Sequence, residues 1–266
     1  MSNATFVVGR KSQKHQRFSE LNAVWLASTG DIRRVVPQAK RGDLWIVLSQ
    51  HYMKCLIKAI HWPLHNRLGD ILVLDTLRYA IVEALHSIFY QVALTGDKGA
   101  VLPCEQLVTV LQSDEKKDLF ISGVIDETSE TMTLWRGDRT SMVVPLSTFR
   151  SSGSGVKPEW NRFEITDFGQ TLQFGEYQAG SDAVLYEFDI EYRRRLKRLR
   201  RDKEKGLGPS LRRLRKQRGL RRDQFTGLSA KTVARIEQGE VTRVHRRTMN
   251  ILADKLGVPS EEIESY

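Results

Sequence analysis

The sequence predicts an α+β fold with a mostly helical N-terminal region, a small antiparallel β domain and an all-α bundle at the C-terminus. Apolar residues recur at helical spacing in the first region, short β-branched and aromatic segments alternate with turns in the second, and short capped helices fill the third. A chain of 266 residues is long enough for two or three domains. The expected domains are 1–112, of unknown role, 118–190, β-rich, and 207–266, with a basic helical linker at 191–206.

The first region is expected to be built mainly from helices. Residues 1–20 are polar and basic and predict an irregular arm, while DLWIVLSQ at 43–50 predicts either a buried strand or the start of a helix. From His51 to Leu94 apolar residues recur three and four apart, which predicts helix, and 103–112 predicts one more short helix. Nothing in this region indicates a particular reaction.

The second region is expected to form a small antiparallel β-meander. Its segments are rich in β-branched and aromatic residues, and turn sequences such as DETSE and DFGQ separate them. The expected strands are 119–126, 131–138, 140–147, 162–169 and 171–177.

The distribution of charge indicates a nucleic-acid-binding segment. The net charge is +10, and residues 191–266 hold 22 Lys and Arg against 10 Asp and Glu, whereas the preceding residues hold 20 against 22. Such a localised basic block suits phosphate binding, because counterion release drives it; a merely solvated tail is the alternative. The arginine-rich part of the helix expected at 183–206 has three interpretations: a second contact with the DNA backbone, a solvated connector, or a dimer helix.

The last sixty residues predict four or five short helices. Gly219 ends the first, Ser229 is a good N-cap for the third, and Gly239 is expected just past the end of the third in the left-handed conformation. The expected helices are 211–218, 221–225, 232–238, 245–258 and, as a turn or fifth helix, 259–266.

Two short helices joined by a tight glycine-containing turn within such a bundle form a helix-turn-helix arrangement. The polar side of the third helix would enter the major groove of DNA, with its N-terminal residues nearest the base edges. Its apolar side would lock it against four residues of the core: Leu211, Leu214, Phe225 and Leu252.

The segments LRRLRKQRGLRRDQF, LSAKTVARIEQGEV and TMNILADKLGVPSEEI resemble the Xre/Cro family of lambda-repressor-like helix-turn-helix domains, over residues 207–266. The resemblance implies sequence-specific DNA binding. TG at 226–227 replaces a longer segment of that family, so the second helix is expected to be clipped. Residues 118–190 are similar to a small bacterial β-rich family of unknown function that occurs with such regulators near putative toxin genes, which implies an autoregulating repressor or antitoxin.

The residues expected to contact bases lie on the third helix. Lys231 and Thr232 stand in its first turn, Ala230 could meet a thymine methyl group, and Arg235 could reach a base, a phosphate or a neighbouring acid. Glu237 is expected to make an ion pair that holds the fold. The residues expected to contact phosphate are Arg221, Arg222, Arg243, His245, Arg246 and Arg247.

Several other kinds of site find little support in the sequence. His61 and His65 have a spacing that zinc can use on a helix, but Pro63 lies between them, and Asp70 and Asp75 lack a partner cluster. We therefore predict no metal, cofactor or catalytic site. RGD at 136–138 suits a hairpin turn better than adhesion.

The sequence also favours one compartment. No apolar run reaches the ~20 residues needed to span a bilayer, and no export signal is evident, so we expect no membrane partner and a cytoplasmic location. Cys55 and Cys104 are then expected to be reduced.

These observations predict a transcriptional regulator, a repressor that binds double-stranded DNA as a homodimer and is not an enzyme. One alternative is an antitoxin or assembly subunit that binds a partner protein through residues 1–190. The other is a nucleic-acid-processing enzyme that the helix-turn-helix delivers to DNA.

Overall fold

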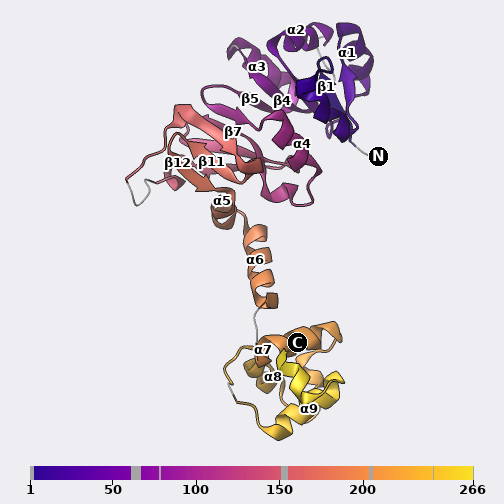
Figure 1. Ribbon diagram of the computed structural model, residues 1–266, viewed down its shortest axis with the longest axis vertical. Coiled ribbons are helices and arrows are strands. Elements are labelled where there is room, and N and C mark those ends of the chain that lie inside the picture. The colour runs from indigo at the N-terminus through magenta and orange to yellow at the C-terminus, as the bar shows by residue number, and fades with distance from the viewer. Residues whose placement is uncertain are drawn as a thin grey trace. The chain divides into compact units, whose positions relative to one another are not determined.

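The computed structural model describes residues 3–60, 67–77, 79–150, 155–203, 206–241 and 243–265. The chain divides into two compact units, Met1–Asp189 and Ile190–Tyr266 (Figure 1). The predicted mixed class of helices and strands is confirmed. The two regions that the sequence separates near residue 112 both belong to the first unit.

The first unit is built around a five-stranded parallel sheet with the order β2-β1-β3-β4-β5. Parallel strands need long crossover connections, and the segments between these strands supply them as helices. The strands are β1 (Thr5–Val8), β2 (Val24–Leu26), β3 (Leu44–Val47), β4 (Leu68–Thr76) and β5 (Phe89–Thr95).

Three helices cover one face of this sheet: α1 (Thr29–Val35), α2 (Gln50–Ala59) and α3 (Tyr79–Ile88) (Figure 1). Their buried side chains form one core with the sheet, in which the Trp45 ring packs 4.6 Å from Phe6 and 6.1 Å from Phe89, between ring centroids. The 3-10 helix η1 (Gln13–Leu21) packs against α4 (Cys104–Gln112), where the Gln112 side-chain amide donates to the Glu20 carbonyl at 2.9 Å.

This sheet is the main departure from the sequence prediction. Helices α2, α3 and α4 are where helices were expected, but β4 and β5 occupy parts of 51–94 that the spacing predicted as helical, and β1 lies in the supposed irregular arm. Strands of a parallel sheet are buried on both faces and read as short continuous apolar runs, which periodicity does not separate from buried helix. The segment 43–50 contains strand β3, one of its two expected outcomes.

The rest of the first unit is antiparallel, and all five predicted strands are confirmed. They belong to two sheets rather than one meander, because the third and fourth predicted strands do not pair with each other. Each sheet also contains one strand that was not predicted, β6 (Gly99–Val101) or β12 (Tyr177–Gly180). The first sheet contains β6 (Gly99–Val101), β7 (Phe120–Asp126), β8 (Thr131–Arg136) and β9 (Ser141–Pro145), and the second contains β10 (Phe163–Thr166), β11 (Thr171–Phe174) and β12 (Tyr177–Gly180). Four short 3-10 helices lie in this antiparallel part: η3 (Lys116–Asp118), η4 (Leu146–Thr148), η5 (Trp160–Arg162) and η6 (Asp167–Gly169). A further one, η2 (Val36–Gln38), follows α1 beside the parallel sheet.

The helix expected at 183–206 is divided into α5 (Ser181–Phe188) and α6 (Ile190–Lys203). Asp189 separates them with an extended backbone, and its carboxylate lies 2.7 Å from Nη1 of Arg136. Both side chains are largely buried, so this ion pair fixes the end of the first unit. It also ties the arginine of the RGD sequence into the fold, in line with a structural turn.

Gly69 provides a test of the parallel sheet. A Cβ at this position would lie 1.9 Å from the carbonyl oxygen of Asp43, which accepts a 2.9 Å hydrogen bond from the Asp70 amide. We expect Gly69→Ala to lower the free energy of unfolding of the first unit by about 1–3 kcal/mol, because β3 and β4 must separate.

Gly30→Ala is the matched control. It lies in α1, where the nearest side-chain atom is 3.7 Å from the new Cβ, so the substitution should leave stability unchanged or raise it by up to about 1 kcal/mol. Urea denaturation of both variants measures the difference, and equal losses would contradict this account.

Candidate nucleic-acid interface

The second unit contains the expected series of short helices after α6. The second helix is reduced to a single 3-10 turn of three residues, as the short TG connection predicts. The elements are α7 (Leu207–Gln217), η7 (Arg222–Gln224), α8 (Ala230–Glu237), α9 (Arg246–Leu256) and α10 (Ser260–Ser265).

The apolar side of α8 is locked into the core of this unit. Val233 and Ile236 are buried, while Leu228 packs against the same cluster from outside. This core contains all four predicted partners: Leu211, Leu214, Phe225 and Leu252. It also includes Ala253, Leu256 and Ile263. One side of α8 is therefore fixed by packing, and the other is left for contact with a ligand.

Both ends of α8 are capped as predicted. The Ser229 hydroxyl accepts a hydrogen bond from the Thr232 amide at 3.0 Å. Gly239 has a φ of +74°, and its amide donates to the Ile236 carbonyl while the Glu240 amide donates to the Arg235 carbonyl, both at 3.0 Å. This pair of bonds is a Schellman motif, which favours glycine at the left-handed position. The caps keep α8 short and well defined.

A buried carboxylate fixes α8 to the two preceding elements. Glu237 is 2% exposed, and its Oε2 accepts hydrogen bonds from Nε of Arg222 at 2.8 Å and Nη2 of Arg215 at 3.2 Å. Nε of Arg215 donates to the other carboxylate oxygen, and its Nη1 donates to the Leu220 carbonyl at 2.8 Å. The prediction that Glu237 holds the fold is confirmed.

Arg215 is not among the residues predicted to serve the fold or the site, although its position in the sequence carries a signal. Arg215 follows Leu211 by four residues and Leu214 by one, so it lies on the buried stripe of its helix, where a charge needs a partner. Arg222 is among the residues predicted to contact phosphate, but in the structure its guanidinium donates to Glu237. Its phosphate contact therefore stays a prediction, secondary to this ion pair.

The residues predicted to contact bases differ in how exposed their side chains are and in whether they already have a partner. Ala230 and Lys231 are exposed in the first turn of α8. Thr232 is half-buried, with its hydroxyl 2.8 Å from that of Ser229. Nε of Arg235 lies 3.2 Å from the Glu240 carboxylate, the acid pairing that was one of its expected outcomes, and both side chains are about half exposed. Lys231 and Arg235 are four residues apart and share one face of the helix.

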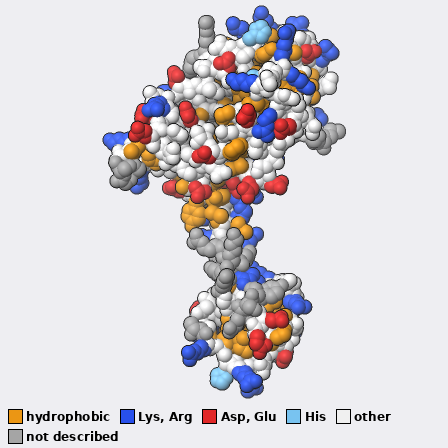
Figure 2. All heavy atoms as spheres, in the orientation of Figure 1, with side chains coloured by type: hydrophobic (Ala, Val, Ile, Leu, Met, Phe, Trp, Pro, Cys, Tyr) orange, Lys and Arg blue, Asp and Glu red, His pale blue; other side chains and the backbone are white. Residues whose placement is uncertain are grey.

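The residues predicted to contact phosphate are exposed, apart from Arg222. Arg221 forms a surface ion pair of 3.3 Å with Asp223. The other four flank the start of α9: Arg243, His245, Arg246 and Arg247. His245 is the N-cap residue of this helix and makes no side-chain capping bond. Figure 2 shows Lys and Arg side chains around the margin of this unit.

The start of α9 is electrostatically unfavourable in the protein alone. Its first turn holds two arginines and no acid, whereas the first turn of α10 holds Glu261 and Glu262. Cations at a helix N-terminus oppose the macrodipole and cost about 0.3–1 kcal/mol each, and an anion placed there relieves this repulsion. The arrangement suits a phosphate ligand.

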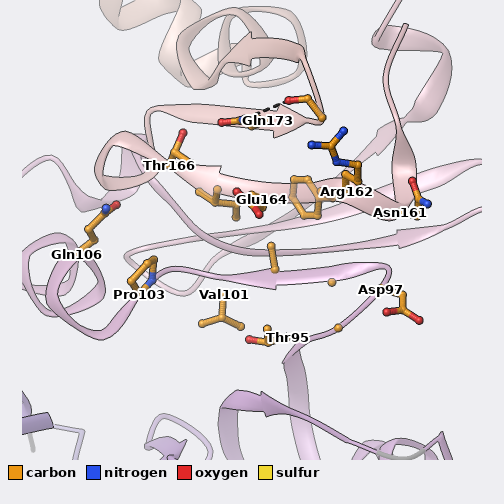
Figure 3. Close-up of a pocket in the computed structure, with 16 residues that line it drawn as sticks. Thr95, Asp97, Val101, Pro103, Gln106, Asn161, Arg162, Glu164, Thr166 and Gln173 are labelled. Atoms are coloured by element: carbon orange, nitrogen blue, oxygen red, sulfur yellow. Dashed lines mark hydrogen bonds between the residues drawn. The ribbon is translucent and has the colours of Figure 1, made fainter. Parts of the chain in front are cut away.

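The first unit has a polar cavity of about 580 Å3 between the β5–β6 turn, β6 and β10 (Figure 3). Its polar lining includes Asp97, Gln106 and Glu164, and Arg162 there is paired with Glu159 at 3.4 Å. In the part of the chain that the structure describes, no group of three or more His, Cys, Asp or Glu side chains could hold a metal ion. His61 and His65 lie outside the described residues.

The remaining singled-out residues of this unit have structural partners. Asp70 lies 3.8 Å from Nη1 of Arg139, and burial raises the pKa of its carboxyl although Arg139 and Arg41 oppose that rise. Asp75 accepts a hydrogen bond of 2.9 Å from the Gln50 amide at the start of α2. Cys55 and Cys104 are free thiols, as predicted. None of the described helices is long and apolar enough to cross a membrane.

Residues 206–265 match the family model of a helix-turn-helix domain. This segment coincides with the one in which the sequence predicts such a domain, and the match supports DNA as its ligand. No curated protein and no solved structure matches the chain. The resemblance noted for 118–190 stays a prediction.

The Glu237 ion network provides a test of how this unit is held together. Glu237→Gln leaves the guanidinium of Arg215, which is 11% exposed, without its charged partner. We expect the unfolding free energy of the second unit to fall by about 3 kcal/mol or more, because an uncompensated buried charge is costly.

Glu240→Gln is the control, since it removes the same charge from the exposed pair with Arg235 and should cost less than about 1 kcal/mol. Thermal and urea denaturation of both variants give the comparison. If the two losses were equal, the buried network would not hold α8 in place.

Proposed function

We propose that the protein is a sequence-specific DNA-binding transcriptional regulator that acts in the cytoplasm as a dimeric repressor. The observation that carries this proposal is α8: its apolar side and Glu237 are locked into the core, while Ala230 and Lys231 stand exposed in its first turn. The major groove of DNA admits an α-helix, and the N-terminal residues of a recognition helix lie nearest the base edges.

The exposed residues divide into two roles. Lys231 suits the acceptor atoms of guanine, and Ala230 suits a thymine methyl group. Arg235 would exchange its surface pair with Glu240 for a base or a phosphate, and Thr232 would contact DNA from beside its cap. Phosphate contacts, which set affinity and register, come from five exposed side chains: Arg221, Arg243, His245, Arg246 and Arg247.

A dimer follows from the small size of the reading surface. One short helix contacts few base pairs, and helix-turn-helix dimers read two half-sites about 34 Å apart. The first unit would then dimerise, sense a signal or recruit a partner. An antitoxin or assembly subunit that binds another protein through residues 1–190 is the alternative role.

We propose binding rather than catalysis for the chain. Asp70 and Asp75, the carboxylates that a nucleic-acid-processing enzyme would have used, are held by Arg139 and by the start of α2. Loss of metal-dependent nicking on mutating either residue, in rigorously purified protein, would contradict this view.

The proposal is tested by genome-wide DNA capture with the full-length protein, followed by binding to the best site and to a scrambled site over a range of salt. We expect an inverted repeat, with half-sites in one helical turn or a multiple of it. Steep salt dependence with no sequence preference would contradict a regulator that reads an operator.

Two alanine variants separate base reading from phosphate binding. Lys231→Ala should reduce discrimination between the best and scrambled sites by about 1–3 kcal/mol, because it removes a base contact. Arg246→Ala should weaken binding to both sites about equally, because a phosphate contact carries no sequence information. Equal losses on both sites for Lys231→Ala would show that it does not read a base.

A further inference from the structure

We propose that α6 is a second binding site for the DNA backbone, separate from the helix-turn-helix. This inference rests on the proposed function, because it takes duplex DNA as the ligand. The stretch of α6 from Ile190 to Arg198 has one acid, Glu191, and five cations: Arg193, Arg194, Arg195, Lys197 and Arg198.

The charges on α6 are only partly offset within the helix. Arg194 pairs with Glu191 at 2.8 Å, but both side chains are highly exposed, so the pair is weak. The guanidinium of Arg195 lies 5.2 Å from the centre of the Tyr192 ring, a contact that leaves its charge in place. Lys197 and Arg198 are exposed.

Arg194, Lys197 and Arg198 share one face of α6, because they stand three and four residues apart. Like charges at this spacing repel one another and destabilise the helix that carries them. A polyanion beside this face would remove the repulsion and release its own condensed counterions. The face is therefore complementary to a phosphate backbone.

The same charges argue against pairing of α6 with a second copy. A coiled coil needs apolar positions sustained over at least three or four heptads, whereas α6 has 14 residues. Leu196 and Leu199 are its late apolar anchors, and Leu199 is 48% exposed. Two such helices side by side would bring their arginines together. DNA is the occupant that the charge favours.

The length of the chain keeps α6 within reach of bound DNA. α6 ends at Lys203 and α7 begins at Leu207, and four residue steps span at most about 14 Å. Arg198 lies a further ~8 Å back along the helix at 1.5 Å per residue. Both distances together are shorter than the ~34 Å of one duplex turn. Arg198 therefore stays within the length of one duplex turn from the start of α7, a separation that permits contact with phosphates flanking the recognised site.

The test uses the full-length protein with Lys197→Gln and Arg198→Gln combined. The matched control combines Lys54→Gln and Lys58→Gln, which remove two exposed lysines from α2 and give the same change in net charge. Glutamine keeps helix propensity close to that of lysine and arginine, and circular dichroism checks that the fold is retained. Binding to the best site and to a scrambled site is measured at about 50 and about 200 mM salt.

Raising the salt from about 50 to about 200 mM lowers the affinity of every protein for DNA. We expect the factor of this decrease to be about 12 times larger for the wild type and the control than for the α6 variant, on both DNA sequences. That factor corresponds to two lost phosphate contacts at a salt slope of about 0.9 each. Equal salt slopes for all three proteins would overturn the role of α6 while leaving the proposed function intact.

Two other results would also be decisive. If the wild type bound no duplex at all, the proposed function would fall together with the inference. If the α6 variant kept its salt slope but changed its oligomeric state in sedimentation velocity, α6 would be a dimer helix and the inference would be wrong.

Discussion

The second unit depends on one buried charge, the carboxylate of Glu237. Removing a carboxylate from water costs several kcal/mol, and here two guanidinium groups offset that cost with directed hydrogen bonds. The bonds come from α7 through Arg215 and from η7 through Arg222. Because η7 has only three residues, it offers little apolar surface of its own to orient α8. The ion network supplies the orientation that a longer second helix would have given.

The second unit was predictable because its helices are marked by signals in neighbouring residues. Much of the first unit was not, because its parallel sheet depends on pairing between segments far apart in the chain. The caps at Ser229 and Gly239 and the apolar spacing of α8 are properties of neighbouring residues, so the helix, its boundaries and its exposed first turn follow directly. The parallel sheet pairs β1 with β3, which are far apart in the chain. The sequence of neither strand indicates which strand it pairs with. Five of the antiparallel strands lie between turn signals and agree with the prediction, whereas the short strands β6 and β12 were not predicted.

The candidate site was predictable in position but not in detail. Lys231 is exposed as its place in the helix requires, because helical spacing fixes the face on which a residue lies. Whether an arginine serves the fold or the surface depends on which acid lies opposite it in space. Arg222 therefore turned out to pair with Glu237, while Arg246 lies exposed at a helix start that its charge makes less stable. A protein retains such an unfavourable charge most readily where a ligand compensates it.

The division of α8 into a buried and an exposed side has a consequence for how its target can change. Ala230, Lys231 and Arg235 lie outside the apolar core and outside the Glu237 network. Substitutions at these positions alter what the helix presents to a base pair without disturbing what holds the helix. Gene duplicates of such a protein can therefore diverge in target sequence while keeping one scaffold, and retargeting by design can be confined to the same few side chains.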